Sequence, residues 1–163
     1  MLLGSYKAII FDLDDTLLDR DNAVNQMFLM ILEKCYEGVD HSTKNKMLLK
    51  FKEYDKSAYG YSDKTKVLES LFDEFPPKRR LPSKDIQAFW NHHFPHCFVI
   101  DQDTIKIVNT LRTQVKVAII TNGLTERQTA KMIHTNLISC FDLILISEEV
   151  GFSKPDRRIF ELA

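Results

Sequence analysis

Three carboxylates follow an apolar run near the start of the chain. Ala8–Phe11 is unbroken by polar residues, and Asp12, Asp14 and Asp15 come directly after it. Such a run is typical of a strand buried on both faces inside a parallel sheet. The carboxyl end of a strand of this kind is where open α/β sheets bind ligands. Since neighbouring carboxylates repel one another unless a cation lies among them, we expect a divalent metal with oxygen ligands here.

The same residues have a simpler interpretation. Asp14, Asp15 and Thr16 could cap a following helix, because Asp and Thr are common N-cap residues. For a single Asp this interpretation would be preferred. For Asp-x-Asp-x-Thr placed immediately after four apolar residues, the pattern favours a functional site.

Two further candidates lie later in the chain. Thr121, Asn122 and Gly123 follow a second apolar run, and a hydroxyl with backbone N–H groups at a strand-to-helix turn suits the oxygens of an anion. An ordinary Asn-Gly turn is the alternative. Lys154 stands just before Pro155, and spacing alone gives it no catalytic role.

The segment between the first strand and the later ones has helical periodicity. Four consecutive helical patterns are predicted there, with no strand between them. The first covers residues 22–37, and the others begin after Ser42, near Asp63 and at Ser83. Ser42 is the predicted N-cap of the second helix. Four helices in succession predict a small helical bundle.

Helices and strands alternate in the rest of the chain. The predicted elements are a helix with Asp103 as its N-cap, a strand at 115–120, a helix at 125–136 with Met132 and Ile133 facing inward, and a strand at 141–146. This alternation predicts a parallel sheet with right-handed crossovers. The chain is therefore predicted to be an α/β core of residues 1–19 and 97–163, interrupted by a helical insert of residues 20–96.

Composition narrows the function classes. A formal net charge of −1 does not indicate the excess of positive charge that nucleic-acid binding requires. No apolar stretch is long enough for a signal peptide or a membrane span. Three widely spaced cysteines imply no disulfide framework, so we expect a cytoplasmic protein with reduced thiols.

Three segments resemble motifs of the haloacid dehalogenase (HAD) superfamily. Asp12, Asp14 and Thr16 match its first motif, a hydrophobic strand followed by Asp-x-Asp-x-Thr. Thr121 matches the second motif, and Lys154 with its following Pro matches the third. The helical insert resembles the cap that many members carry between the first two motifs. The resemblance implies a Rossmann-like parallel α/β sheet with an inserted α-helical cap domain.

The resemblance also implies a reaction, the Mg²⁺-dependent hydrolysis of small phosphomonoesters through an aspartyl-phosphate. Asp12 would be the nucleophile and Asp14 the general acid and base, and the same two residues would hold the metal. Thr121, Asn122 and Lys154 would bind the phosphoryl group. The region from Ile119 to Pro155 most resembles a nucleotidase-like subgroup, which makes a nucleoside monophosphate one candidate substrate.

Two alternatives stay open. The chain could be a 2-haloacid dehalogenase, in which an Asp attacks carbon without a metal, although the first motif of those enzymes lacks the acid that Asp14 supplies here. It could also be a catalytically inactive HAD-like binding module, because the acidic fourth motif of the family does not occur before Ala163. We expect the chain to be truncated before that motif.

Overall fold

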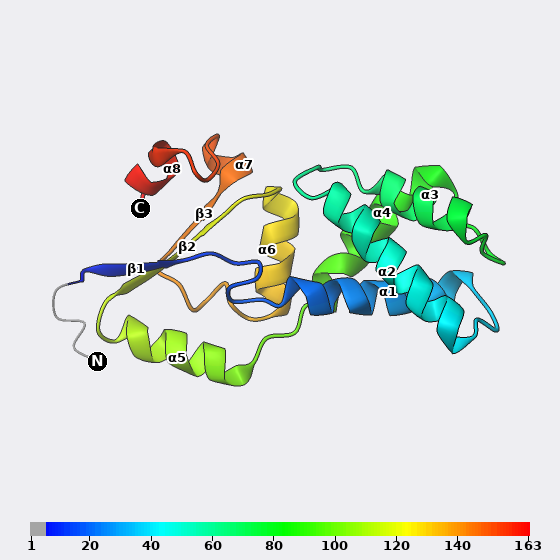
Figure 1. Cartoon of the computed structure of the whole chain (residues 1–163). Coiled ribbons are helices and arrows are strands. Elements are labelled where there is room, and N and C mark those ends of the chain that lie inside the picture. Colours follow the sequence, from blue (N-terminus) through cyan, green and yellow to red (C-terminus); the bar gives the residue numbers. More distant parts are fainter. Residues whose placement is uncertain (1–5) are drawn as a thin grey trace. The chain divides into compact units, whose positions relative to one another are not determined.

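The computed structural model describes residues 6–163, which form a parallel sheet with flanking helices and a separate set of helices (Figure 1). In chain order the elements are β1 (Ala8–Phe11), α1 (Arg20–Cys35), α2 (His41–Ser57), α3 (Thr65–Glu74), α4 (Ser83–His93), the 3₁₀ helix η1 (Phe94–Cys97), α5 (Gln102–Arg112), β2 (Lys116–Thr121), α6 (Thr125–His134), β3 (Leu143–Ile146), α7 (Ser147–Val150) and α8 (Arg157–Glu161). Each of the longer predicted helices and strands is present in the structure as the predicted type of element.

The chain divides into two compact units. One contains the sheet and is built from the chain up to Arg20 together with Phe98–Ala163, and the other is the helical segment Asp21–Cys97. Each unit contains buried apolar side chains of its own. That the helical unit serves as a cap for the active site remains a prediction.

The three strands are parallel and lie in the order β1-β2-β3. Phe11 at the end of β1 is opposite Ile119 of β2, and Thr121 at the end of β2 is opposite Ile146 of β3. Parallel strands present their carboxyl ends at one edge of the sheet. The loops that follow β1 and β2 therefore leave the sheet at the same edge.

The first strand differs from its prediction. β2 is buried from Val117 to Thr121, whereas β1 alternates between exposed and half-buried residues, and Ile10 is 43% exposed. Within residues 6–163, β1 pairs with β2 alone and is an edge strand. The prediction that it is buried on both faces is wrong for this reason.

Two predicted N-caps are also wrong. Asp40, rather than Ser42, caps α2, because its backbone is extended and its Oδ1 accepts a hydrogen bond of 3.0 Å from the N–H of Thr43. Asp101, rather than Asp103, caps α5 in the same way. In both cases the capping Asp lies two residues before the predicted cap. Sequence periodicity locates a helix better than its first residue.

Helix α6 turns a different face inward from the one predicted. Met132 is buried as expected, but Ile133 is 57% exposed. The polar side chains of Gln128 and Lys131 take inward positions instead, with exposures of 2% and 5%. This change matters for the site, because it places an amide and an amine beneath the loops that follow β1 and β2.

The helical unit has its own aromatic core. Phe51 of α2 lies 5.7 Å from Phe28 of α1 and 6.0 Å from Trp90 of α4, measured between ring centroids, and all three side chains are buried. Aromatic pairs at this separation add to the free energy of burial. In the described part of the chain, no helix combines the length and apolar character needed to cross a bilayer.

Candidate active site

The loop after β1 holds Asp12 at the edge of the sheet. The N–H groups of Leu17 and Leu18 both donate to the carbonyl of Leu13, which folds the loop back on itself around the fully buried Leu13 side chain. Asp15 adopts a positive φ of 58° within this turn, a conformation that Asp tolerates better than most residues. The carboxylate of Asp12 is left 45% exposed, so it can meet a ligand.

Lys154 pairs with that carboxylate. Its Nζ lies 2.6 Å from Oδ1 of Asp12, which also accepts a hydrogen bond of 2.7 Å from the N–H of Leu13. The Lys154 side chain is 22% exposed, so its charge is partly shielded from water. The structure thus brings together the acid of the first predicted motif and the lysine of the third.

Asn122 joins the loop after β2 to the backbone at Lys154. Its Nδ2 donates to the carbonyl of Lys154, and its Oδ1 accepts from the N–H of Lys154. Both ends of the side-chain amide are therefore used within the protein. A contact of Asn122 with a phosphoryl group could use its backbone N–H or the second N–H of Nδ2.

Thr121 is buried and contacts the side chain of Gln128. The Gln128 Nε2 lies 2.6 Å from Oγ1 of Thr121, 3.1 Å from the carbonyl of Asn122 and 3.3 Å from Oδ2 of Asp14. The same amide nitrogen therefore touches residues of the first and second predicted motifs.

Asp14 forms a largely buried ion pair. The Nζ of Lys131 lies 2.8 Å from each of its carboxylate oxygens and 4.6 Å from the centroid of the Phe98 ring. Burial lowers the pKa of Lys131, while the charge of Asp14 acts in the opposite direction. The loop after β1 thus carries two acids that contact two different lysines.

Gln128 and Lys131 were not among the predicted site residues. With Met132 and Thr135 they follow the i, i+3, i+4, i+7 spacing of one helical face, and all four side chains are buried. That spacing is the signal in the sequence that could have found them. The prediction placed the apolar Ile133 inward instead of Lys131, and it therefore assigned the wrong face of the helix to the core.

The site offers hard oxygen ligands to a cation. Within residues 6–163 no group of three or more His, Cys, Asp or Glu side chains could hold a metal. Mg²⁺ commonly binds through one or two carboxylates, together with water and the phosphate of a substrate. The half-exposed carboxylate of Asp12 fits that description.

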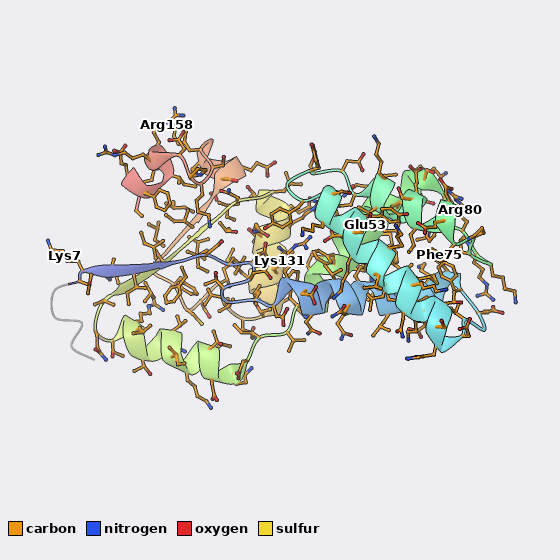
Figure 2. All side chains as sticks on the ribbon, in the orientation of Figure 1. Lys7, Glu53, Phe75, Arg80, Lys131 and Arg158 are labelled. Atoms are coloured by element: carbon orange, nitrogen blue, oxygen red, sulfur yellow. The ribbon has the colours of Figure 1, made fainter. Side chains whose placement is uncertain are left out.

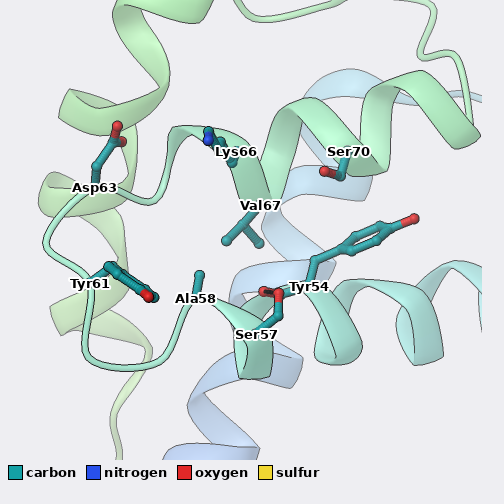
Figure 3. A pocket seen from close by; sticks show the side chains of 8 residues that line it. All are labelled: Tyr54, Ser57, Ala58, Tyr61, Asp63, Lys66, Val67 and Ser70. Atoms are coloured by element: carbon teal, nitrogen blue, oxygen red, sulfur yellow. Dashed lines mark hydrogen bonds between the residues drawn. The ribbon is translucent and has the colours of Figure 1, made fainter.

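The helical unit contains a hollow of its own. It has a volume of about 400 Å³ and lies between α2, α3 and the loop that joins them (Figure 3). Its lining residues are Tyr54, Ser57, Ala58, Tyr61, Asp63, Lys66, Val67 and Ser70. The predicted site residues are all outside this hollow.

The fold and site define a Rossmann-like α/β protein with its candidate site residues at the carboxyl ends of the strands. The chain belongs to the haloacid dehalogenase-like hydrolases, whose family model matches residues 9–163. It is therefore an enzyme of the hydrolase class, as the resemblance of its motifs predicted.

Two curated relatives cover most of the chain. The pyrimidine 5'-nucleotidase YjjG of Escherichia coli is 30% identical over 160 residues, which are 95% of this chain and 68% of the relative. The glyceraldehyde 3-phosphate phosphatase of Methanothermobacter thermautotrophicus is 29% identical over 165 residues, or 96% of this chain and 70% of the relative.

Solved structures share the fold. The HAD-hydrolase YfnB from Bacillus subtilis, bound to magnesium, superposes with a TM-score of 0.69 at 21% identity, over 96% of this chain and 70% of that one. The L-2-haloacid dehalogenase from Xanthobacter autotrophicus, with chloropropionic acid covalently bound, superposes with a TM-score of 0.66 at 16% identity. The superposition covers 96% of this chain and 62% of that one. These similarities confirm the predicted α/β fold.

Proposed function

We propose that the protein hydrolyses small phosphomonoesters through a phosphorylated Asp12. The observation that carries the proposal is the contact between the half-exposed carboxylate of Asp12 and the Nζ of Lys154, at 2.6 Å. A carboxylate needs a nearby positive charge to approach an anionic phosphoryl group, because two unit charges of like sign at 4 Å repel by about 4 kcal/mol at an effective dielectric of 20. Lys154 supplies that charge.

In the first step a carboxylate oxygen of Asp12 attacks phosphorus and the bond to the ester oxygen breaks. Asp14, in its protonated form, gives a proton to the departing alcohol. In the second step Asp14 takes a proton from water, which attacks phosphorus and breaks the bond to Asp12. Inorganic phosphate leaves and both side chains return to their starting forms. Such acid and base assistance is typically worth about 10² to 10⁴ in rate.

Thr121, Asn122 and Lys154 are proposed to bind the phosphoryl group. Thr121 would use its hydroxyl, and Lys154 its ammonium, to stabilise charge on the phosphoryl oxygens. Asn122 would donate an N–H from its backbone or the second N–H of Nδ2, and its side chain would also place Lys154 by binding the backbone of that lysine.

Asp12 and the backbone carbonyl of Asp14 are proposed to hold Mg²⁺. The magnesium bound in the YfnB structure supports the choice of ion. When bound, the ion would reduce the charge repulsion between the carboxylate and the phosphoryl oxygens. The remaining ligands would include water and substrate oxygens, as is usual for this ion.

The substrate class is proposed from the relatives. The names of the two curated proteins refer to a pyrimidine nucleotidase and a glyceraldehyde 3-phosphate phosphatase, both acting on small phosphate esters. A small phosphomonoester is therefore the proposed substrate, and a nucleoside monophosphate is one candidate. Asp14 favours this chemistry over dehalogenation, because a departing alkoxide requires a proton and a departing halide does not.

Release of phosphate tests the proposal. The full-length protein is incubated with p-nitrophenyl phosphate and with pyrimidine nucleoside monophosphates, each with and without Mg²⁺, and release of chloride from 2-chloropropionate is measured in parallel. We expect Mg²⁺-dependent release of phosphate that Asp12→Asn reduces to the level of a blank while the unfolding temperature is unchanged. Release of chloride without Mg²⁺, or full activity of the Asp12→Asn variant, would overturn the proposal.

A further inference from the structure

Helix α6 carries two buried polar side chains that point toward the loop after β1. Gln128 and Lys131 stand one turn apart, and both are more than nine-tenths buried. Figure 2 labels Lys131 on this helix. Both side chains reach Asp14, which lies 117 positions away from Lys131 in the sequence.

The contact between Lys131 and Asp14 is a poor device for stability alone. The two side chains are 7% and 14% exposed, so both charges lose much of their hydration on folding. Replacement of a buried ion pair by apolar residues of similar size is often neutral or stabilising. If these two positions served stability alone, apolar side chains could therefore occupy them. The presence of the ion pair indicates another role.

Gln128 adds a second point of attachment. Its Nε2 lies within 3.3 Å of three oxygens, which belong to Asp14, Thr121 and Asn122. The amide fits there because Gly123 has no side chain, since a Cβ at that position would lie 3.3 Å from the Cγ and Cδ of Gln128. The loops after β1 and β2 are thus tied to one another through one helix.

We propose that Lys131 and Gln128 are positioning residues for Asp14, with Lys131 fixing its carboxylate in direction and Gln128 fixing the distance between Asp14 and Thr121. This inference rests on the proposed function, in which Asp14 passes a proton to the departing oxygen. A proton is transferred efficiently only at hydrogen-bond distance. A displacement of about 1 Å in such a group can reduce the rate roughly 100-fold.

The variant Lys131→Met tests the role of the lysine, with Lys106→Met as its matched control. Lys106 lies on α5 of the same unit, is 74% exposed and pairs with Asp103. Activity is measured on an aryl phosphate, whose phenolate leaves readily, and on an alkyl phosphate, whose alkoxide requires a proton. We expect Lys131→Met to lower kcat/KM for the alkyl ester about 100-fold or more, with a much smaller loss of kcat/KM for the aryl ester. The constant kcat/KM includes expulsion of the alcohol but not the later attack of water, in which Asp14 acts as base on both substrates.

Two further variants separate positioning from folding. Lys131→Arg keeps the charge and should recover part of the lost rate on the alkyl ester. Combining Lys131→Met with Asp14→Asn should lower the rate no further than Asp14→Asn does, because residues acting as a unit are not additive. Equal losses of kcat/KM on both esters, or additive losses in the double variant, would overturn the proposal.

A measurement without turnover covers substrates that are not cleaved, and it is made on variants whose spectra are those of a folded protein. Couplings between the α and β protons of Asp14 report its χ1 angle by NMR. We expect one staggered rotamer in the wild type and in Lys106→Met, and averaged couplings in the milder variant Gln128→Ala and in Lys131→Met. Unchanged couplings in both variants would overturn the inference. If the wild-type chain cleaves no ester, or Asp12→Asn stays active, the proposed function fails separately, and the couplings still decide the positioning.

Discussion

The side-chain amide of Asn122 forms two hydrogen bonds with the backbone of Lys154, with its Nδ2 2.9 Å from the carbonyl oxygen and its Oδ1 2.8 Å from the amide nitrogen. Lys154 therefore contacts the loop after β1 through its charge on Asp12, and it is attached to the loop after β2 through its backbone. This attachment crosses between two strands of the sheet, and its consequences can be measured.

Asn122→Ala should lower the activity of the enzyme more than its stability. It removes two hydrogen bonds at a solvent-exposed position, each with a net contribution of about 0.5–1.5 kcal/mol. If the free energy of these two hydrogen bonds serves to hold Lys154 in place, kcat/KM falls roughly 5-fold to 100-fold. Steady-state hydrolysis of p-nitrophenyl phosphate measures this fall in kcat/KM. Asn109→Ala, an exposed change on α5, is the control and should leave kcat/KM unchanged. An Asn122→Ala enzyme with wild-type kcat/KM would show that Lys154 needs no such support.

Gly123→Ala should destabilise the sheet unit. Gly123 has a φ of 141°, which a residue with a Cβ rarely adopts, and the added methyl group would also press on Gln128. Backbone strain of this kind costs about 1–3 kcal/mol, which urea unfolding detects. Gly151→Ala is the control, since Gly151 has a φ of 77° but no atom within 4 Å of the place where a Cβ would lie. Combining Gly123→Ala with Gln128→Ala should recover part of the loss, and a double variant without any recovery would contradict the proposed contact.

Lys64→Met should destabilise the helical unit. Lys64 and Asp55 are 6% and 2% exposed, and the Lys64 Nζ lies 3.7 Å from Asp55 Oδ1 and 2.5 Å from the carbonyl of Ala58. Removing one partner of a buried ion pair typically costs about 3–5 kcal/mol. Urea unfolding followed by fluorescence of Trp90, which is buried in this unit, measures the change.

The matched comparison is the double variant Lys64→Met with Asp55→Leu, which removes both charges. It should be more stable than Lys64→Met alone. An exposed pair in the same unit, Lys50 and Glu53, supplies the control, because Lys50→Met should change stability by no more than about 0.5 kcal/mol. A Lys64→Met variant as stable as Lys50→Met would show that the buried pair has little effect.

Asp156 should make stability depend on pH in the acid range. It caps α8 and accepts hydrogen bonds from the side chain and the backbone N–H of Arg158, which lower its pKa from 3.8 to about 2. A carboxyl whose pKa is lower in the folded state stabilises the fold above pH 3.8, and that contribution is lost as pH falls toward 2. The difference in unfolding temperature between the wild type and Asp156→Asn should therefore be largest above about pH 4 and shrink toward about pH 2. A difference that is constant over this range would exclude the linkage.

Much of the site could be predicted from the sequence because its signals are local. The apolar run of β1 followed by Asp12 and Asp14, and the strand that ends in Thr121, are each contained within a few residues. Strand formation and the alternation of helices with strands depend on nearest-neighbour patterns, which a single sequence displays directly. These signals predicted the family and the α/β fold, and the family match and the solved structures confirm both.

Burial of individual residues could not be predicted in the same way. The apolar content of β1 is that of a central strand, yet its place in the sheet depends on which strands pair with it, and Ile10 is exposed for that reason. On α6 the apolar Ile133 faces outward, while Lys131 is buried because Asp14 is available to pair with its charge. A charged side chain is buried only where the fold brings it a partner.

The sequence by itself thus determined the order of the elements, the family and the residues of the three recognisable motifs. The tertiary structure alone decided that Lys154 contacts Asp12, that Asn122 attaches to Lys154, and that Lys131 and Gln128 contact Asp14. The physical reason is the range of the interactions. Hydrogen-bonded turns and periodic burial act over a few residues, whereas an ion pair between positions 117 apart exists only after the sheet has brought its loops to one edge.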